Sequence, residues 1–199
     1  MHSGNSTIVI LAAGSSLRMG NHKFALELRP GLSFLEHISL QYNEFGCEQI
    51  IIVLNPDGLD YLNRIELDLP VGTQTVANPV ADTGRFSSVK AGLMHAKKGN
   101  PVFIHNVDNP FADKQMLTKL IENHKPGAFI CPVFGGKGGH PVLLSPEVVK
   151  AILLEKSNSL VLKDFLKGFE RIPICVQDPK VLVNVNTREE LELVKANPI

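Results

Sequence analysis

Hydrophobic residues are grouped along this chain in two recurring patterns. In the first, apolar residues follow one another without polar alternation, as at 7–13 and 49–54, which is typical of strands covered on both faces in a parallel sheet. In the second, apolar residues recur three and four positions apart, as at 32–45, which predicts a helix with one buried face. These three segments form a strand–helix–strand unit, which predicts an α/β fold with a mostly parallel central sheet.

The same patterns predict the remaining elements. Further strands are expected at 73–77, 101–107, 127–132, 171–176 and 181–185. Further helices are expected at 59–65, 86–94, 113–123, 145–154 and 159–166, with a last helix after Thr187. The strand at 73–77 is less apolar than the first two and is therefore expected nearer a sheet edge. Residues 55–58 are turn formers, and Met94 is expected on the apolar face of its helix.

Composition sets broad limits on the protein. A length of 199 residues fits a single domain, 1–199, since single cores rarely exceed about 250 residues. The 20 acidic and 20 basic residues give a formal net charge of zero, so neither nucleic acid nor a membrane is expected as a partner. The three cysteines form no C-x-x-C pair, which argues against a zinc ribbon or a disulfide framework. We therefore expect a cytoplasmic protein, with 1–6 disordered.

The segment after the first predicted strand combines an open backbone with positive charge. Ala13 and Gly14 carry no bulk that would keep a ligand away, and Arg18 and Lys23 add two cations. Neither a dinucleotide-binding G-x-G-x-x-G nor a P-loop is present. The combination suits a polyphosphate; the alternative is an ordinary turn with incidental basic residues.

Polar residues also occur at the ends of later elements. Ser87 and Ser88 fall in the first turn of a predicted helix, where unpaired N–H groups favour a phosphate or a base edge; capping of that helix is the alternative. Asp108 follows a buried strand, at the edge where open α/β sheets bind ligands, although Asp before Asn-Pro also forms turns. Thr187 can cap the last helix, with Glu190 completing a capping box.

Five stretches resemble, in order along the chain, the motifs of the MobA/MocA-like nucleotidyltransferases. The first is L-A-A-G-x-S-x-R-M-G-x-x-K at 11–23. The other family motifs are G-M-S-S-S-L-x-A-G-L, D-M-P-F, G-H-P-V-L and N-x-N-T-P-E-D-L. This chain resembles them at 84–93, 108–111, 139–143 and 184–191, respectively. The chain departs from these motifs at Arg85, Phe86, Asn109 and Arg188, among other positions. Taken alone, the stretch at 108–111 would also be compatible with a turn, and the stretch at 139–143 with the tip of a glycine-rich hairpin.

The resemblance implies a Rossmann-like three-layer sandwich of the nucleotide-diphospho-sugar transferase type. It implies attack by an acceptor phosphate on the α-phosphorus of a nucleoside triphosphate, with release of pyrophosphate. Arg18, Lys23 and Asp108 would be catalytic, and Asp108 and Asn186 would hold Mg²⁺, which needs few protein ligands when substrate phosphates are present. His140 would lie on the acceptor side. The residues implied to bind the nucleotide are Leu11, Ala12, Ala13, Gly14, Asn78, Gly84, Ser87 and Ser88.

The resemblance leaves several substrates open. The Ala-Ala-Gly opening and the Gly-His-Pro-Val motif favour CTP, whereas the Asn-x-Asn ending is closer to the guanylyl branch and leaves GTP possible. Molybdopterin is the acceptor of the first hypothesis, but the changes at Arg85 and Phe86 permit a sugar or polyol phosphate. A non-catalytic nucleotide-binding protein is the third hypothesis, because Asn186 is a neutral ligand. The chain is expected to be a monomer or a homodimer.

Overall fold

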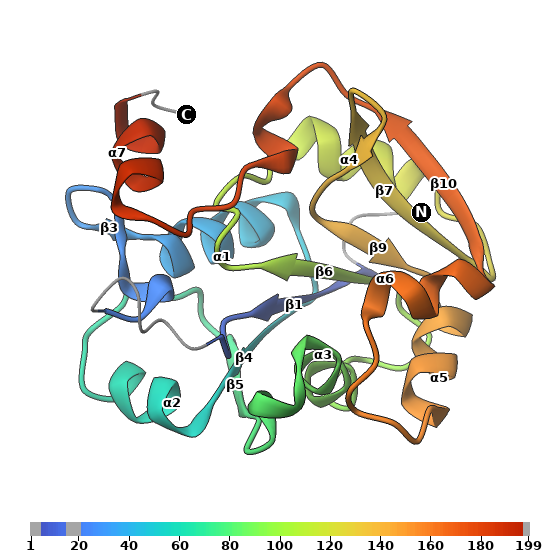
Figure 1. The fold of residues 1–199 in the computed structure, drawn as a ribbon, viewed down its shortest axis with the longest axis horizontal. Coiled ribbons are helices and arrows are strands. Elements are labelled where there is room, and N and C mark those ends of the chain that lie inside the picture. Colours follow the sequence, from blue (N-terminus) through green and yellow to red (C-terminus); the bar gives the residue numbers. More distant parts are fainter. Residues whose placement is uncertain (1–4, 15–20, 197–199) are drawn as a thin grey trace.

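The computed structural model describes residues 5–14 and 21–196, which form one large sheet with helices on both faces (Figure 1). The strands, in their spatial order, are β10 (Glu170–Cys175), β7 (Ala128–Phe134), β9 (Val142–Leu144), β6 (Val102–Asn106), β1 (Thr7–Leu11), β4 (Gln49–Leu54) and β5 (Gln74–Ala77), with β8 (Lys137–Gly138) paired to β7. Only β9 and β8 pair antiparallel in this sheet. A small second sheet joins β2 (Glu27–Arg29) to β3 (Leu32–Ser33). The predicted α/β fold with a mostly parallel sheet is confirmed.

Strand β1 forms the centre of the sheet. It pairs in parallel with β4 on one side and with β6 on the other, and each of its residues is buried. This explains its unbroken apolar sequence, since both faces of the strand are covered. Strand β5 lies at the edge of the sheet, as its more polar sequence predicted.

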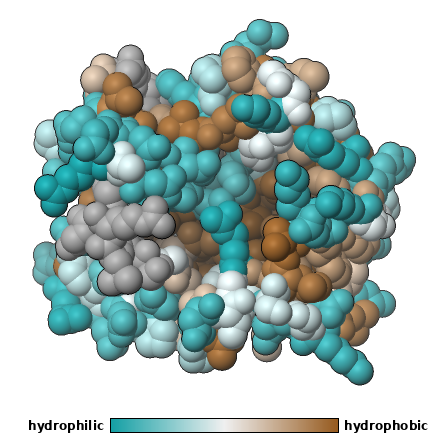
Figure 2. All heavy atoms as spheres, viewed as in Figure 1, coloured by the Kyte–Doolittle hydropathy of each residue, from teal (hydrophilic) through white to brown (hydrophobic). Residues whose placement is uncertain are grey.

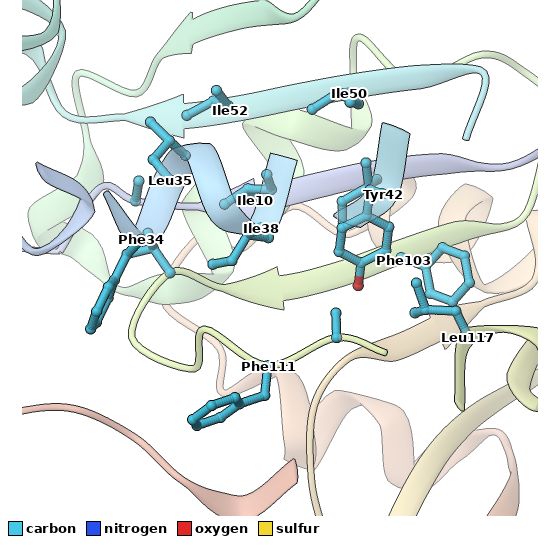
Figure 3. Packing of buried hydrophobic residues seen from close by; sticks show 14 of the residues in the cluster. Ile10, Phe34, Leu35, Ile38, Tyr42, Ile50, Ile52, Phe103, Phe111 and Leu117 are labelled. Atoms are coloured by element: carbon cyan, nitrogen blue, oxygen red, sulfur yellow. The ribbon is translucent and has the colours of Figure 1, made fainter. Parts of the chain in front are cut away.

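Helices cover the two faces of the sheet as separate layers. Side chains alternate between the two faces of β1, so Ile8 and Ile10 pack in one core while Val9 and Leu11 pack in the other. The first core is covered by α1 (Phe34–Phe45), α2 (Pro56–Leu62), α4 (Lys114–Glu122) and α7 (Arg188–Ala196). The second is covered by α3 (Arg85–Leu93), α5 (Pro146–Leu154) and α6 (Leu162–Phe165). Figure 3 shows the side chains of α1 packed against β1 and β4 in the first core.

Local sequence explains where the helices begin and end. Ser33 and Glu36 form a capping box at the start of α1, and Gly46 ends it with a φ of 93°, a conformation that favours glycine. Asp113 and Ser145 cap α4 and α5 through their side chains. None of the described helices has the length and apolar character needed to cross a membrane.

Four expectations about local structure were wrong. Residues 55–58 do not form a free turn, because Asn55 caps α2 and Pro56 occupies its first position. The expected strand at 181–185 is absent, because its first residues belong to the 3₁₀-helix η5 (Pro179–Leu182). Met94 is 73% exposed, because α3 ends one residue earlier. Ser6 is buried and its carbonyl accepts from Glu48 N, so it is not disordered; residues 1–4 lie outside the described residues.

Helix α3 lies close to the sheet because Gly92 faces β1 and β4. A Cβ atom at this position would come within 2.3 Å of Val9 Cγ1 and 2.9 Å of Val53 Cγ2. Real Cβ atoms do not approach other atoms so closely, so the absence of a side chain sets the distance between the helix and the sheet.

We predict that Gly92→Ala lowers the free energy of unfolding by about 1–3 kcal/mol, because the added methyl group overpacks the interface. Alanine normally stabilises a helix relative to glycine, so the sign of the effect is diagnostic. Gly168→Ala is the control, since nothing lies within 4 Å of its added Cβ. Chemical denaturation measures both variants, and a stabilised Gly92→Ala variant would contradict the packing argument.

Candidate functional site

A cavity of about 250 Å³ opens at the carboxyl ends of β1 and β6. These neighbouring strands mark the point where the order of connections reverses, because β1 leads to β4 on one side while β6 lies on the other. Open α/β sheets bind ligands at such a point. Figure 2 shows the hollow over β1, with a hydrophobic floor and a hydrophilic rim.

Most of the predicted central residues meet in this cavity. It is lined by Leu11, Ala12, Ala13, Gly14, Lys23, Ser88, Asp108 and Asn186, all of which the sequence singled out. Ala81, Arg85, Asn106 and Val107 complete the lining. Arg18 lies outside the described residues, so its predicted role stays a prediction. Gly14 has open space where a Cβ would be, which leaves the backbone accessible beside β1.

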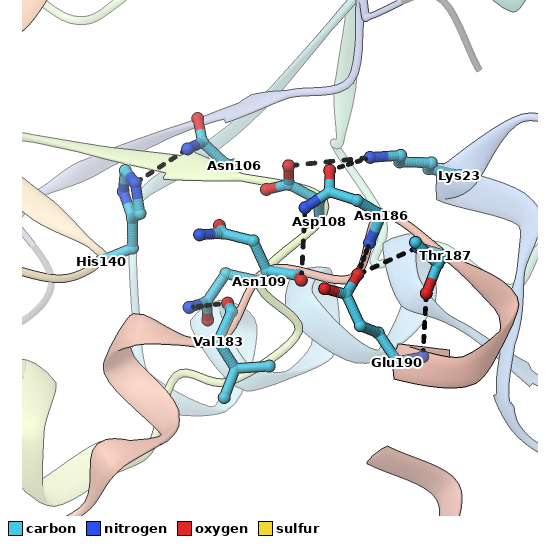
Figure 4. Close-up of polar contacts among 10 residues, drawn as sticks. Lys23, Asn106, Asp108, Asn109, His140, Val183, Asn186, Thr187 and Glu190 are labelled. Carbon is cyan, nitrogen blue, oxygen red and sulfur yellow. Dashed lines mark hydrogen bonds and ion pairs between the residues drawn. The ribbon is translucent and has the colours of Figure 1, made fainter. Parts of the chain in front are cut away.

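Lys23, Asp108 and Asn186 form a polar cluster at the centre of the site (Figure 4). The Nζ atom of Lys23 donates to Asn186 Oδ1 at 2.7 Å and lies 3.9 Å from Asp108 Oδ2. The side chains of Lys23 and Asp108 are only 20% and 16% exposed, so water screens their attraction incompletely. These three residues, of which the nearest two are 78 positions apart in the sequence, thus meet at one edge of the sheet.

Asp108 is held in an unfavourable electrostatic environment. Burial raises the pKa of its carboxyl above the usual value, and the nearby charges of Lys23 and Arg85 oppose that rise. Its Oδ1 atom is buried and accepts no hydrogen bond from any residue that the structure describes. Such an oxygen is suited to a further cationic partner.

The donor set fits Mg²⁺. This ion takes one or two protein carboxylates together with water and substrate phosphate oxygens. Asp108 supplies a carboxylate with one unsatisfied oxygen, and Asn186 supplies an amide oxygen opposite it. Among the described residues, no cluster of three or more His, Cys, Asp or Glu side chains has the arrangement of a metal centre. The protein alone therefore offers a sparse site that substrate oxygens would complete.

Asn109 positions the segment that carries Asn186. Its Nδ2 atom donates to the carbonyl oxygens of Val183 at 2.7 Å and of Lys180 and Val181 at 3.2 Å. Val185 N then donates to Asp108 O at 2.7 Å, which brings Asn186 opposite Asp108. Sequence reasoning treated Asn109 only as a departure from the family motif, because the acceptors it binds are distant in sequence.

The capping box at α7 forms as expected. Thr187 N donates to Glu190 Oε2 at 3.0 Å, and Glu190 N donates to Thr187 Oγ1 at 3.2 Å. Asn186 N also donates to Glu190 Oε2, at 2.6 Å. The N–H group of Asn186 therefore takes part in the cap, while its side-chain Oδ1 accepts from Lys23 Nζ, so capping of the helix and a role in the site are compatible.

Asn78, Ser87 and Ser88 form a hydrogen-bonded group at the start of α3. Asn78 Nδ2 donates to Ser87 Oγ at 2.8 Å and to Ser88 Oγ at 3.0 Å. Helix α3 begins after Gly84 without a side-chain cap, so the capping alternative for the serines is not observed. Ser88 lines the cavity, whereas Asn78, Gly84 and Ser87 are not among the described residues that line it.

His140 stands behind the cavity wall. Its Nε2 atom lies 2.8 Å from Asn106 Nδ2, and it is Asn106 that lines the cavity. The His140 ring stacks on His105, whose Nδ1 is 3.1 Å from the hydroxyl of the buried Tyr42. Burial lowers the pKa of His140 to about 4 and that of His105 to about 3, so both rings are neutral near pH 7. A neutral His140 accepts the hydrogen bond from Asn106 and fixes the orientation of its amide.

Three functional candidates were missed by sequence reasoning. Arg85 and Asn106 line the cavity, and Asn109 supports its wall. Arg85 sits in the first turn of α3 and its charge acts on both Asp108 and His140. The position of Arg85 beside Ser87 and Ser88 was a usable signal, whereas only the folded sheet brings Asn106 beside His140.

Comparison with known proteins identifies the family of this chain. Residues 8–171 match the model of the MobA-like NTP transferase domain. The chain therefore belongs to this family, and the predicted class of nucleotidyltransferase is confirmed.

The proteins to which this chain is similar are named for different activities. A probable molybdenum cofactor guanylyltransferase of Carboxydothermus hydrogenoformans is 27% identical over 197 residues, 94% of each chain. Nicotine blue oxidoreductase of Paenarthrobacter nicotinovorans is 25% identical over 168 residues, 81% of each chain. A nucleotidyl transferase from Methanothermobacter has the same fold, with a TM-score of 0.77, 18% identity and 96% of each chain covered. The predicted fold class is therefore confirmed, whereas similarity to these proteins does not identify the substrate.

The lowered pKa values of His105 and His140 predict a pH-dependent stability. Between pH 6.5 and about 4 these histidines take up protons in the unfolded chain but not in the folded protein, so acidification favours unfolding. We expect the free energy of unfolding to fall by up to about 1.4 kcal/mol per pH unit for each histidine in that window.

His140→Gln, which retains an acceptor for Asn106, should reduce this pH dependence between pH 6.5 and 5. His95→Gln at an exposed position is the matched control. Urea denaturation at stepped pH values measures the slopes, and equal slopes for wild type and His140→Gln would count against a neutral buried ring.

Proposed function

We propose that this protein is a Mg²⁺-dependent nucleotidyltransferase that moves a nucleoside monophosphate from a nucleoside triphosphate to a phosphorylated small molecule. The observation that supports this most directly is the convergence of Lys23, Asp108 and Asn186 beside the open backbone of Gly14. Together these groups offer a phosphate-binding cation, oxygen ligands for a metal and room for a nucleotide at one edge of the sheet.

The reaction requires alignment and charge neutralisation more than covalent chemistry. An acceptor phosphate oxygen forms a bond to the α-phosphorus while the bond from that phosphorus to the bridging oxygen breaks, and pyrophosphate leaves. Lys23, and Arg18 by our prediction, hold the triphosphate. Asp108 and Asn186 would hold Mg²⁺, which when bound neutralises charge on the phosphate oxygens.

The order of the strands supports a division of the site between the two substrates. Asn78 follows β5 and Gly14 follows β1, so the nucleotide is proposed to lie along the β1–β5 half of the sheet, with the base near Ser87, Ser88 and Gly84. His140 and Asn106 lie on the β6–β9 half. We therefore propose that the acceptor contacts Asn106, with His140 acting through it.

We propose CTP as the preferred nucleotide and molybdopterin as the acceptor, with GTP as the alternative nucleotide. The Ala-Ala-Gly opening supports CTP, and the likeness to a guanylyltransferase supports GTP. Cytoplasmic action is proposed because Cys47, Cys131 and Cys175 are all free thiols, as expected in a reducing compartment.

Arg85 favours a second candidate acceptor. This cation lines the cavity at a position where the family motif carries methionine, and it can bind a phosphate oxygen. A sugar or polyol phosphate would then replace molybdopterin, with the same transfer of a nucleoside monophosphate.

A turnover screen tests the proposal. The protein is incubated with each of CTP, GTP, UTP and ATP, with Mg²⁺, and with molybdopterin or a panel of sugar and polyol phosphates, and pyrophosphate release is measured. Turnover with one acceptor supports the proposal and identifies the substrate. Nucleotide binding without turnover on any acceptor would support a non-catalytic nucleotide-binding protein instead.

We predict that Asp108→Asn lowers kcat by at least about 100-fold, because the carboxylate that would hold the metal becomes neutral. Its stability should stay equal or rise, since burial of the charged carboxylate is unfavourable in the folded protein. Asp60→Asn on the exposed surface is the matched control. Initial rates and thermal unfolding of both variants measure the effect, and undiminished activity of Asp108→Asn would remove the metal assignment.

A further inference from the structure

The described part of the cavity wall carries more positive than negative charge. Lys23 and Arg85 are its cations, and Asp108 is its carboxylate, which gives the described lining a net charge of +1. A free divalent cation would raise that charge to +3. A nucleoside triphosphate carries about four negative charges near neutral pH, so its complex with one divalent metal would lower the net charge to about −1.

The ammonium group of Lys23 occupies one of the two oxygens that are suited to a metal, Asn186 Oδ1, and lies near the carboxylate that carries the other, Asp108 Oδ1. It donates to Asn186 Oδ1 at 2.7 Å and lies 3.9 Å from Asp108 Oδ2, as the dashed lines of Figure 4 show. Mg²⁺ binds oxygen at about 2.0–2.1 Å, so a metal on Asn186 Oδ1 would lie within about 4–5 Å of the ammonium. The two cations would repel each other strongly in a partly buried site.

A polyphosphate changes this balance. Its oxygens accept hydrogen bonds from an ammonium and also bind Mg²⁺. Once a triphosphate is present, Lys23 can exchange the neutral amide of Asn186 for an anionic partner. Asn186 Oδ1 then becomes available to a metal, together with the unsatisfied Asp108 Oδ1.

We propose that Lys23 excludes free divalent cations from this site, so that the cavity accepts a metal only as a complex with a polyphosphate. The nature of the polyphosphate rests on the proposed function; the exclusion of the free cation does not. Lys23 thereby couples the binding of metal and nucleotide, and by linkage each raises the affinity for the other by the same factor.

Titration of Mn²⁺, followed by electron paramagnetic resonance, tests the proposal. The wild-type protein is titrated alone and with a non-hydrolysable CTP or GTP analogue. We expect the analogue to tighten Mn²⁺ binding by at least about tenfold. Lys23→Met should bind Mn²⁺ alone at least about tenfold more tightly than wild type, and the analogue should tighten it further by much less.

Two controls separate charge from other effects. Lys23→Arg retains a cation and should keep the weak binding of free Mn²⁺. Lys167→Met removes an exposed lysine that pairs with Asp164 far from the cavity and should behave as wild type. Thermal unfolding confirms that each variant is folded, and Lys23→Ala replaces Lys23→Met if the latter is not.

Two results would overturn the inference. One is binding of free Mn²⁺ by Lys23→Met within about twofold of wild type, and the other is wild-type binding of Mn²⁺ that is equally tight with and without nucleotide. If no nucleotide analogue binds at all, the proposed function fails, yet the comparison of free Mn²⁺ binding between wild type and Lys23→Met still decides whether Lys23 excludes the cation.

Discussion

The complete burial of β1 between β4 and β6 is the constraint on which the site depends. A strand with no exposure on either face must satisfy its backbone through parallel partners on both sides. The chain can then reach solvent only at the strand ends. The carboxyl ends of β1 and β6 consequently place Gly14 and Asp108 on the same edge of the sheet. The order of the strands therefore sets the position of the cavity, and the side chains then set its chemistry.

Hydrogen bonds from Asn109 and His140 hold in place the segment that leads to Asn186. The segment 179–183 consists mainly of the short 3₁₀-helix η5; its carbonyl oxygens accept hydrogen bonds from Asn109, and Val181 O also accepts from His140 N. Gly139 allows this approach, because a Cβ there would lie 2.3 Å from Val181 O. The predicted strand at 181–185 is absent, and this part of the chain is instead held by the buried amide of Asn109 and by its close approach to Gly139. The same contacts bring Asn186 and His140 to opposite parts of the site.

Charge distribution gives the site its chemical character. The whole chain is neutral, so long-range attraction does not select the ligand. Locally, two cations and one carboxylate line the cavity, and Lys23 and Asp108 are buried enough that water screens their attraction incompletely. This arrangement suits an anionic ligand that arrives with its own metal. In our proposal the neutral amide of Asn186 serves at a position where a second carboxylate would have drawn in free cations.

The sequence by itself determined the mostly parallel α/β fold, the edge position of β5 and the capping box of the last helix, and it predicted a phosphate site in the first loop. Those features depend on local spacing: apolar runs, capping residues, and glycine beside cations. It could not determine that Asn109 braces the segment 179–183, that Asn106 stands between His140 and the cavity, or that Lys23 binds Asn186. Each of these contacts joins residues at least 34 positions apart, and only the packing of the sheet decides which distant polar groups meet.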